Sequence, residues 1–288
     1  MALTLEWRGR IDQYRSVLQK LFYRPLGQVA LRGFVTKEQL TPGMALRRPM
    51  KAMPAGKPWG TKWEYGWFRG SVRLPAEARG KRIALRPGPE VRQWTVDSGG
   101  DARVVVDGRD AGESDFCHRE ITLTRNGVPG RTYDVLFEVY AGHGPIAWHI
   151  GPLPDGQVAI PEAAPRQRVV EPVSFGIWEE DVYQTWLDFE TLVLLRDNLE
   201  ADSLRVAEID EGLKAFTVCV DVELPREGML KTLAAGRRLL KPLLSCRNGS
   251  TAPVFYCFGH SHIDIAWLWP LQETERKCAR TFSTQLAL

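Results

Sequence analysis

Long hydrophobic runs are missing from this sequence. No apolar stretch approaches the ~18 residues that a membrane-spanning helix needs. Residues 1–14 also carry charges at the positions where a signal peptide would have its apolar core. We therefore expect a cytoplasmic protein that has no membrane partner.

A strong excess of charge of one sign is missing as well. The 38 Lys and Arg residues are nearly balanced by 35 Asp and Glu residues, which leaves a formal net charge of +3. The basic residues are scattered between acidic ones and form no stripe, so nucleic acid is not expected as a partner.

Cysteine is scarce and irregularly spaced. The five residues are Cys117, Cys219, Cys246, Cys257 and Cys278. Their odd number and their apolar or mixed surroundings favour buried free thiols over a disulfide framework. What the chain does have is 44% apolar residues with ten Trp. Its 288 residues are enough for about two domains of ~100–200 residues each.

A helix is predicted over residues 4–23, within an N-terminal segment 1–29. Apolar residues recur there at three- and four-residue steps and so share one face. They are Trp7, Ile11, Tyr14, Leu18 and Leu21. Thr4 is the expected N-cap, and Pro25 lies just past the end.

Residues 30–160 have a different pattern, in which short β-type segments alternate with turn signals. The segments are 72–75, 82–86, 102–110, 120–127 and 132–140. Asp107-Gly108 and Asn126-Gly127 are dipeptides of the hairpin type. A strand spacing of roughly 8–12 residues predicts an antiparallel β-sandwich that resembles a jelly roll. Alternation along 132–140 predicts one buried face and one partly exposed face.

Residues 161–250 are assigned to a linker and a helical unit. Prolines cluster over 145–172, which few regular elements tolerate. Helical periodicity then returns over 176–246, in three segments.

Residues 251–288 carry a strand, loop and helix pattern. Val254–Phe258 is a continuous apolar run, as expected of a strand that is buried on both faces of a parallel sheet. Residues 271–288 have a helical pattern with an apolar stripe. This order is typical of the first unit of an α/β domain. Since the neighbouring strands are missing, we expect 251–288 to be loosely held and to promote association between chains.

A cluster of chemically active side chains follows this predicted strand. In an extended segment His260, His262 and Asp264 share one side, and imidazole and carboxylate donors suit Zn²⁺. Cys257 has the opposite parity, which argues against a Cys/His zinc knuckle. Trp267 is a flat platform for a sugar ring, although core packing explains a tryptophan equally well. The spacing alone leaves a metal site and a run of surface polar residues open.

The segment GHSHIDIAWLWPLQETERKCARTFS, residues 259–283, closely resembles the start of the catalytic domain of class II α-mannosidases of the cytosolic type, glycoside hydrolase family 38. Upstream, WEYGWFRGSVRLP (63–75) and VVVDGRD (104–110) resemble the β-rich N-terminal domain of the same enzymes. The resemblance implies that 251–288 is the first βα unit of an α/β-barrel catalytic domain, truncated in this chain.

The resemblance also implies roles for particular residues. His262 and Asp264 match zinc ligands, with one Zn²⁺ per catalytic domain, and Trp267 matches the residue that stacks on mannose. His260 matches a position beside the site that is not a ligand. The nucleophile and the acid of the retaining mechanism would lie beyond residue 288, so the chain carries no catalytic residue. Glu273 matches the helix after the motif, where an acid in the first turn is favoured by the helix dipole.

The expected function is therefore hydrolysis of terminal α-linked mannose in oligosaccharides, with a homo-oligomer possible for the full-length enzyme. Two alternatives stay open. In an amidohydrolase-type enzyme both His260 and His262 would be ligands, and the β-rich domain could act as a non-catalytic carbohydrate-binding or assembly module.

Overall fold

The computed structural model describes residues 3–88, 100–115, 118–143, 155, 168–247, 249, 252–267 and 269–287. The chain divides into two compact units, each built from separate segments. The first, here called the helical unit, comprises Met1–Arg24 and Trp178–Phe258, and the second, the β unit, comprises Pro25–Ile177 and Gly259–Leu288. The sequence-based limits at 29, 160 and 250 differ from these, because the first and last helices each group with distant segments.

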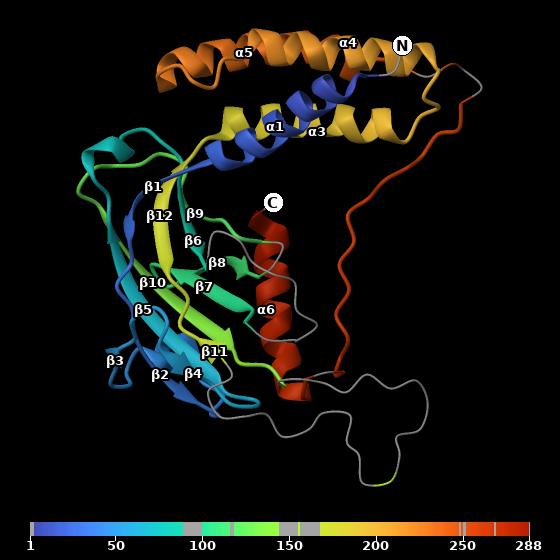
Figure 1. Ribbon diagram of the computed structural model, residues 1–288. Helices are drawn as coiled ribbons and strands as arrows, with labels where there is room; N and C mark the ends of the chain where they lie inside the picture. Colours follow the sequence, from blue (N-terminus) through green and yellow to red (C-terminus); the bar gives the residue numbers. More distant parts are fainter. Residues whose placement is uncertain are drawn as a thin grey trace. The chain divides into compact units, whose positions relative to one another are not determined.

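Four long helices form the helical unit. They are α1 (Leu5–Leu21), α3 (Glu180–Asp197), α4 (Leu204–Cys219) and α5 (Arg226–Leu244). The predicted N-cap of α1 is confirmed, since the Thr4 hydroxyl accepts a hydrogen bond from the Trp7 amide at 3.4 Å. Leu18, Phe189 and Phe216 are fully buried in the common core. Figure 1 shows α1, in blue, lying beside α3.

Two antiparallel sheets make up most of the β unit. The six-stranded sheet has the order β3 (Lys51–Ala52), β2 (Arg32–Thr36), β5 (Tyr65–Arg73), β10 (Thr132–Tyr140), β7 (Ala102–Val106), β8 (Arg109–Ser114). The four-stranded sheet has the order β1 (Tyr23–Gln28), β12 (Val173–Trp178), β6 (Ile83–Pro87), β9 (Ile121–Thr124). Smaller elements are β4 (Pro58–Trp59), β11 (Arg168–Val169), α2 (Pro42–Ala45) and a 3-10 turn at Ala76–Ala78.

The two sheets share one apolar core, which is the arrangement of a β-sandwich. Leu85 and Ile177 come from the four-stranded sheet, Val104 and Val135 come from the six-stranded sheet, and all four are buried in the same cluster. The expectation that residues 30–160 form antiparallel strands in two packed sheets is therefore confirmed for the described residues. The strand β12 lies outside that range, and it replaces the helical start that was predicted from residue 176.

One of the two hairpin dipeptides forms a hairpin. Asp107 and Gly108 connect β7 to β8 with φ values of 48° and 79°, as a type I′ turn requires. Asn126-Gly127 does not, because β9 and β10, which flank it, belong to different sheets.

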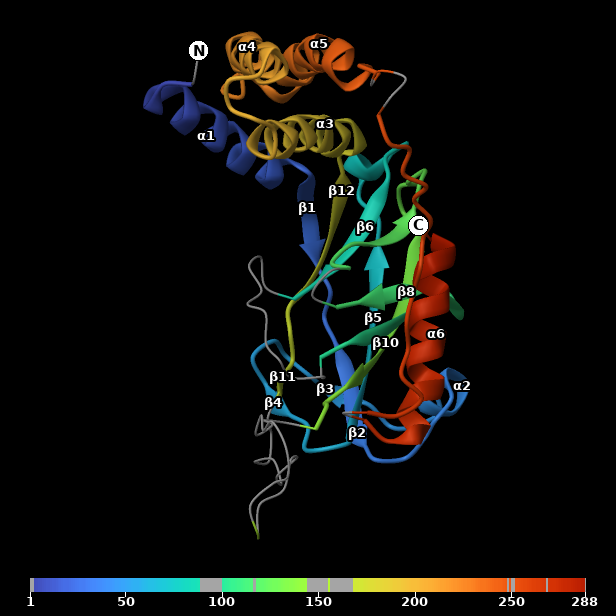
Figure 2. The same ribbon diagram turned by 90° about the vertical axis from the view of Figure 1, so that its right-hand side faces the viewer.

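The last helix, α6 (Leu271–Ala287), has a partner, contrary to expectation. It packs on β8 and β7 of the six-stranded sheet, as Figure 2 shows. Its buried residues are polar: Glu273, Arg276, Arg280 and Thr284. The apolar residues Leu271, Phe282 and Leu286 are exposed. The predicted stripe was therefore assigned to the wrong face of the helix.

The outer face of β10 is buried for the same reason. Leu136, Glu138 and Tyr140, which were expected to be partly exposed, are at most 2% exposed. Arg276 of α6 reaches Glu138, and Trp269, just before α6, packs in the same cluster as Leu136 and Tyr140.

The predicted strand Val254–Phe258 does not form. These residues have no regular secondary structure, and Phe255, Tyr256 and Phe258 are each more than 80% exposed. A doubly buried strand needs ladder partners on both edges, and no described strand pairs with this segment. Cys257 and Cys246 are exposed rather than buried, whereas Cys219 and Cys278 are half-buried free thiols. Cys117 and most of the proline cluster lie outside the described residues.

Candidate functional site

The segment from Gly259 to Pro270 connects an exposed stretch to a firmly packed helix. Its described residues, 259–267 and 269–270, have no regular secondary structure. The helix α6 begins at Leu271, and the Glu273 amide donates to the Pro270 carbonyl at 2.9 Å. Thr274 donates to the Ile265 carbonyl, which ties the end of the segment to the first turn of α6. The first turn of α6 therefore fixes the C-terminal end of this segment.

His262 and Asp264 lie together on this segment. The Nε2 atom of His262 is 3.0 Å from Oδ1 of Asp264, and their side chains are 73% and 40% exposed. The sequence predicts that His260, His262 and Asp264 share one side of an extended segment, and the structure brings His262 and Asp264 of these three together. His260 is exposed and is not part of this pair.

These two donors fit zinc in kind but not in number. Imidazole nitrogen and carboxylate oxygen are both zinc ligands, and a tetrahedral ion takes four donors. Within the described residues, no three His, Cys, Asp or Glu side chains are grouped so that they could hold a metal ion. The pair can supply half of a zinc site, with further donors needed from elsewhere.

The two tryptophans of the segment have different surroundings. Trp267 is 60% exposed and meets Trp269 edge to face, with ring centroids 6.0 Å apart. Trp269 packs against the buried cluster over β10, donates to the Thr274 hydroxyl at 3.2 Å, and has the Lys277 ammonium 4.4 Å from its ring centroid. Trp269 thus anchors the segment, and Trp267 keeps an open ring face.

Glu273 is the centre of a buried ionic network below α6. Its carboxylate accepts from the Tyr65 hydroxyl at 2.7 Å and from Arg280 at 2.5 Å, and the side chain is fully buried. Glu273 lies in the first turn of α6, as the sequence-based interpretation has it, but its side chain is buried in contacts that the sequence did not predict. The charge is buried because Arg280 neutralises it.

The other members of the network bind α6 to β10, to β8 and to two residues outside the strands. Arg276 donates to Glu138 at 2.6 Å and to the Leu40 carbonyl at 3.2 Å. Lys277 reaches Asp101 at 3.3 Å, and Arg280 also reaches Glu113 at 3.0 Å. The Glu113 amide donates to the Thr284 hydroxyl at 2.9 Å.

Burial shifts the titration of these acids. Desolvation raises the pKa of Glu113 to about 7, although Arg280 opposes the shift. Burial likewise raises the pKa of Glu138, with Arg276 opposing. Burial alone would raise the pKa of Asp101 too, but Lys277 and Arg280 outweigh it and lower that pKa. The neighbouring cations therefore outweigh the effect of burial on the pKa of Asp101, but not on that of Glu113.

Sequence reasoning missed this network, although a signal was present. Polar residues recur at 273, 276, 280 and 284, which is a helical repeat in its own right. Glu, Arg and Thr are mostly exposed in proteins. The face of an amphipathic helix that carries them is therefore ordinarily expected to point toward water.

Residues 253–288 match the family model described as glycosyl hydrolases family 38 N-terminal domain. The match contains the whole segment that carries His262, Asp264 and Trp267. The resemblance to the N-terminal portion of family 38 α-mannosidases is confirmed.

Curated relatives extend the family 38 resemblance along the chain. Alpha-mannosidase 2C1 of Mus musculus is 24% identical over 98% of this chain, and that of Homo sapiens is 25% identical over 98%. The chain spans only 27% of the length of each. An alpha-mannosidase of Saccharomyces cerevisiae is 54% identical over 33 residues, which cover 12% of this chain and 3% of that protein.

A β-glucuronidase structure from Ruminococcus gnavus overlaps 54% of this chain and 29% of its own, with a TM-score of 0.35 and 14% identity. None of the helices in the described part of the chain is long and apolar enough to cross a membrane.

Proposed function

We propose that this chain is the N-terminal part of a zinc-dependent retaining α-mannosidase that hydrolyses terminal α-linked mannose in oligosaccharides. The observation that carries the proposal is the close His262–Asp264 pair within the segment that matches family 38. The names of the relatives supply the substrate class, mannose-containing glycans. The proposal includes a cytoplasmic location, and it takes the β unit as a jelly-roll-like domain and residues 251–288 as the start of an α/β-barrel catalytic domain.

Each residue of the segment has a role in this proposal. His262 and Asp264 would hold Zn²⁺, which supplies Lewis-acid polarisation of sugar oxygens when bound. Trp267 offers its exposed ring to the apolar face of a mannose unit, and His260 lies beside the site without binding the metal. The nucleophile and the proton donor, two carboxyl groups ~5 Å apart in a retaining enzyme, are not among these residues. We therefore expect the 288-residue chain alone not to hydrolyse an aryl α-mannoside.

The test uses this chain continued into a complete family 38 enzyme. Zinc content by mass spectrometry and release of phenol from an aryl α-mannoside are measured for His262→Ala and Asp264→Ala. Both variants should lose zinc and turnover together, by about 100-fold or more in turnover, because each removes a metal ligand. If His262→Ala keeps both, the proposed metal site is wrong.

His118→Ala is the matched control, since His118 also pairs with a nearby acid, Asp115, at 3.0 Å. It should keep both zinc and turnover. His260→Ala separates the proposal from the amidohydrolase alternative, in which His260 is a ligand. In the mannosidase this variant keeps its zinc, whereas in an amidohydrolase-type site it loses the metal.

A further inference from the structure

Trp267, the exposed tryptophan of the proposed sugar site, is held by its neighbour Trp269. The Trp267 amide donates to the Trp269 carbonyl at 3.3 Å, and the two rings meet edge to face with their centroids 6.0 Å apart. An edge-to-face pair has a preferred geometry, so the orientation of one ring depends on that of the other. The direction of the open Trp267 face is therefore set by the contacts that fix Trp269.

Two residues of α6 fix the Trp269 ring. Thr274 accepts a hydrogen bond from the indole Nε1 at 3.2 Å and itself donates to the Ile265 carbonyl. Lys277 places its ammonium 4.4 Å from the ring centroid, and tryptophan is the aromatic side chain that attracts a cation most strongly. Residues three apart on a helix lie on the same side. Thr274 thus holds the edge of the indole while Lys277 holds its face.

Asp101 of the β unit in turn fixes Lys277. Its carboxylate lies 3.3 Å from the Lys277 ammonium. Its carbonyl accepts from the Tyr140 amide at 3.1 Å, and the Gly100 amide donates to the Tyr140 carbonyl at 2.8 Å, so the backbone here is bound to the end of β10. Burial acts to raise the pKa of Asp101, but Lys277 and Arg280 outweigh it and lower that pKa, so the carboxylate is charged at neutral pH.

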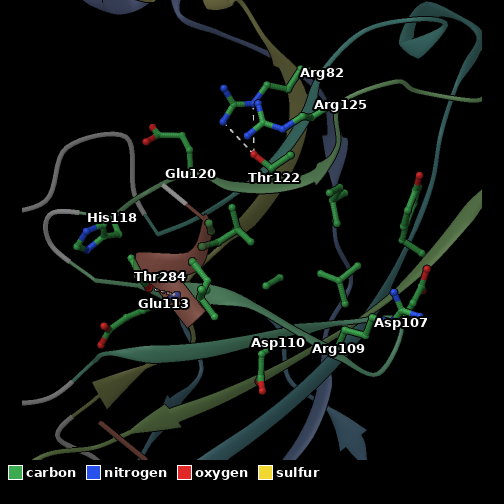
Figure 3. Close-up of a pocket in the computed structure, with 18 of the residues that line it drawn as sticks. Arg82, Asp107, Arg109, Asp110, Glu113, His118, Glu120, Thr122, Arg125 and Thr284 are labelled. Atoms are coloured by element: carbon green, nitrogen blue, oxygen red, sulfur yellow. Dashed lines mark hydrogen bonds between the residues drawn. The ribbon is translucent and has the colours of Figure 1, made fainter. Parts of the chain in front are cut away.

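The helix that carries Lys277 is itself docked along its length. Arg280, one turn further on, donates to Glu113 at 3.0 Å. Near the end of α6 the Glu113 amide donates to the Thr284 hydroxyl at 2.9 Å, and Figure 3 shows these two residues beside each other in the wall of a cavity. Lys277 is therefore a fixed point from which the less regular segment before α6 is held.

We propose that Lys277 and Asp101 are positioning residues for sugar binding, which fix Trp269 and through it the open ring face of Trp267. The inference rests on the proposed function, in which Trp267 offers that face to mannose. Neither positioning residue touches the sugar. Asp101 lies outside residues 253–288, which match the family model, so the β unit contributes to the sugar site from outside the motif.

Fluorine NMR of the 288-residue chain labelled with fluorotryptophan tests the positioning without any substrate. The resonances of Trp267 and Trp269 are assigned through Trp→Phe variants. Lys277→Met should shift or broaden both resonances, and Asp101→Asn should act in the same direction, whereas Lys277→Arg keeps a cation for the ring and should restore them. Lys277→Met should stay folded, because Arg280 remains 4.0 Å from Asp101. Resonances of Trp267 and Trp269 that are unchanged in Lys277→Met would overturn the proposal.

Lys214 provides the matched control, because the helical unit contains a similar arrangement. Its ammonium lies 5.8 Å from the Trp7 ring centroid and 2.8 Å from the Glu211 carboxylate. Lys214→Met should alter the Trp7 resonance and leave that of Trp267 as in the parent. If Trp267 responds equally to Lys214→Met and Lys277→Met, the response is a general loosening of the chain and the proposed positioning is wrong.

The effect on sugar binding is measured in this chain continued into a complete family 38 enzyme. Stacking holds the sugar alike before and during the reaction, so Lys277→Met should raise the KM for an aryl α-mannoside about threefold or more, with kcat and zinc content unchanged. Added to Trp267→Ala, it should raise KM no further, since both changes act through one ring.

Two outcomes separate this inference from the proposed function. A KM that rises in Trp267→Ala but not in Lys277→Met, or effects of the two changes that add, would overturn the positioning and leave the mannosidase proposal intact. A KM that is unchanged in Trp267→Ala would show that Trp267 is not the sugar platform, and the proposed role of Trp267 would fail together with the inference built on it.

Discussion

At the scale of single residues, Glu113 is an acid whose ionisation is strongly affected by folding. Its pKa rises from an ordinary 4.5 to about 7, mainly because burial penalises the charged form. Between these pH values the folded chain keeps a proton that the unfolded chain has lost. Glu113 therefore makes the free energy of unfolding fall as pH rises from about 4.5 to about 7, and contributes no slope outside this window.

We predict that Glu113→Gln removes this slope. Each pKa unit corresponds to about 1.4 kcal/mol, so the variant should differ from the parent by up to about 3 kcal/mol in the change of unfolding free energy across the window. Urea unfolding followed by circular dichroism at several pH values measures it. Glu77→Gln, at an exposed position, is the control. Parallel pH profiles for the parent and Glu113→Gln would show that Glu113 is ionised alike in both states.

At the scale of elements, the sequence predicted those strands and turns whose formation depends on residues close together in the chain. The strand over 132–140 matches β10 at both ends, and Asp107-Gly108 forms its hairpin, because alternation and turn chemistry act over a few residues. The strands β1, β2 and β12 were missed because their pairing is remote. At Gly33 of β2, a Cβ atom would lie 2.2 Å from the Trp67 carbonyl oxygen, a constraint that appears only once β5 is in place.

The orientation of α6 could not be predicted for a related reason. Periodicity shows that a helix has two faces, but not which surface it will meet. The six-stranded sheet presents Glu113, Glu138 and Tyr65 toward α6, and these select the polar face of the helix. In the segment before α6, the spacing predicted that His262 and Asp264 lie on one side, but it included His260 as well, and it did not predict the anchoring by Trp269.

We predict that Arg280→Met weakens the docking of α6 far more than Phe282→Ala does. Arg280 is fully buried, and its loss leaves Glu273 and Glu113 without their main counter-charge. Removing one partner from a buried ion pair costs about 3–5 kcal/mol, whereas Phe282 is 58% exposed and its truncation should cost within about 0.5 kcal/mol. Urea unfolding and hydrogen exchange over 271–287 measure both variants. Adding Glu273→Gln to Arg280→Met should recover part of the loss, and an equal effect of Arg280→Met and Phe282→Ala would contradict the ionic account.

At the scale of the whole molecule, both units are discontinuous in sequence. Residues 1–24 complete the helical unit that begins again at 178, and 259–288 complete the β unit. The expectation that 251–288 is loosely held therefore applies only to its first part, the exposed stretch up to Phe258. The helix α6 covers Tyr65, Leu136, Glu138 and Tyr140, which are at most 2% exposed in its presence.

This reverses the expected effect of shortening the chain. A chain that ends at residue 270 should be less stable in its β unit, because the outer face of the six-stranded sheet loses its cover and Glu138 loses Arg276. Hydrogen exchange should accelerate in β10, β5 and β7, while α3 to α5, which belong to the other unit, should exchange as before. The control is a full-length chain in which residues 252–258 are replaced by a glycine-serine sequence of equal length. Because that stretch is exposed, hydrogen exchange in β10, β5 and β7 should stay as slow as in the parent. If the chain ending at 270 exchanges as slowly as the parent in β10, then α6 contributes nothing to the sheet. The opposite result would show that the final helix, although it is part of a segment that resembles a catalytic domain, stabilises the β unit through its charges.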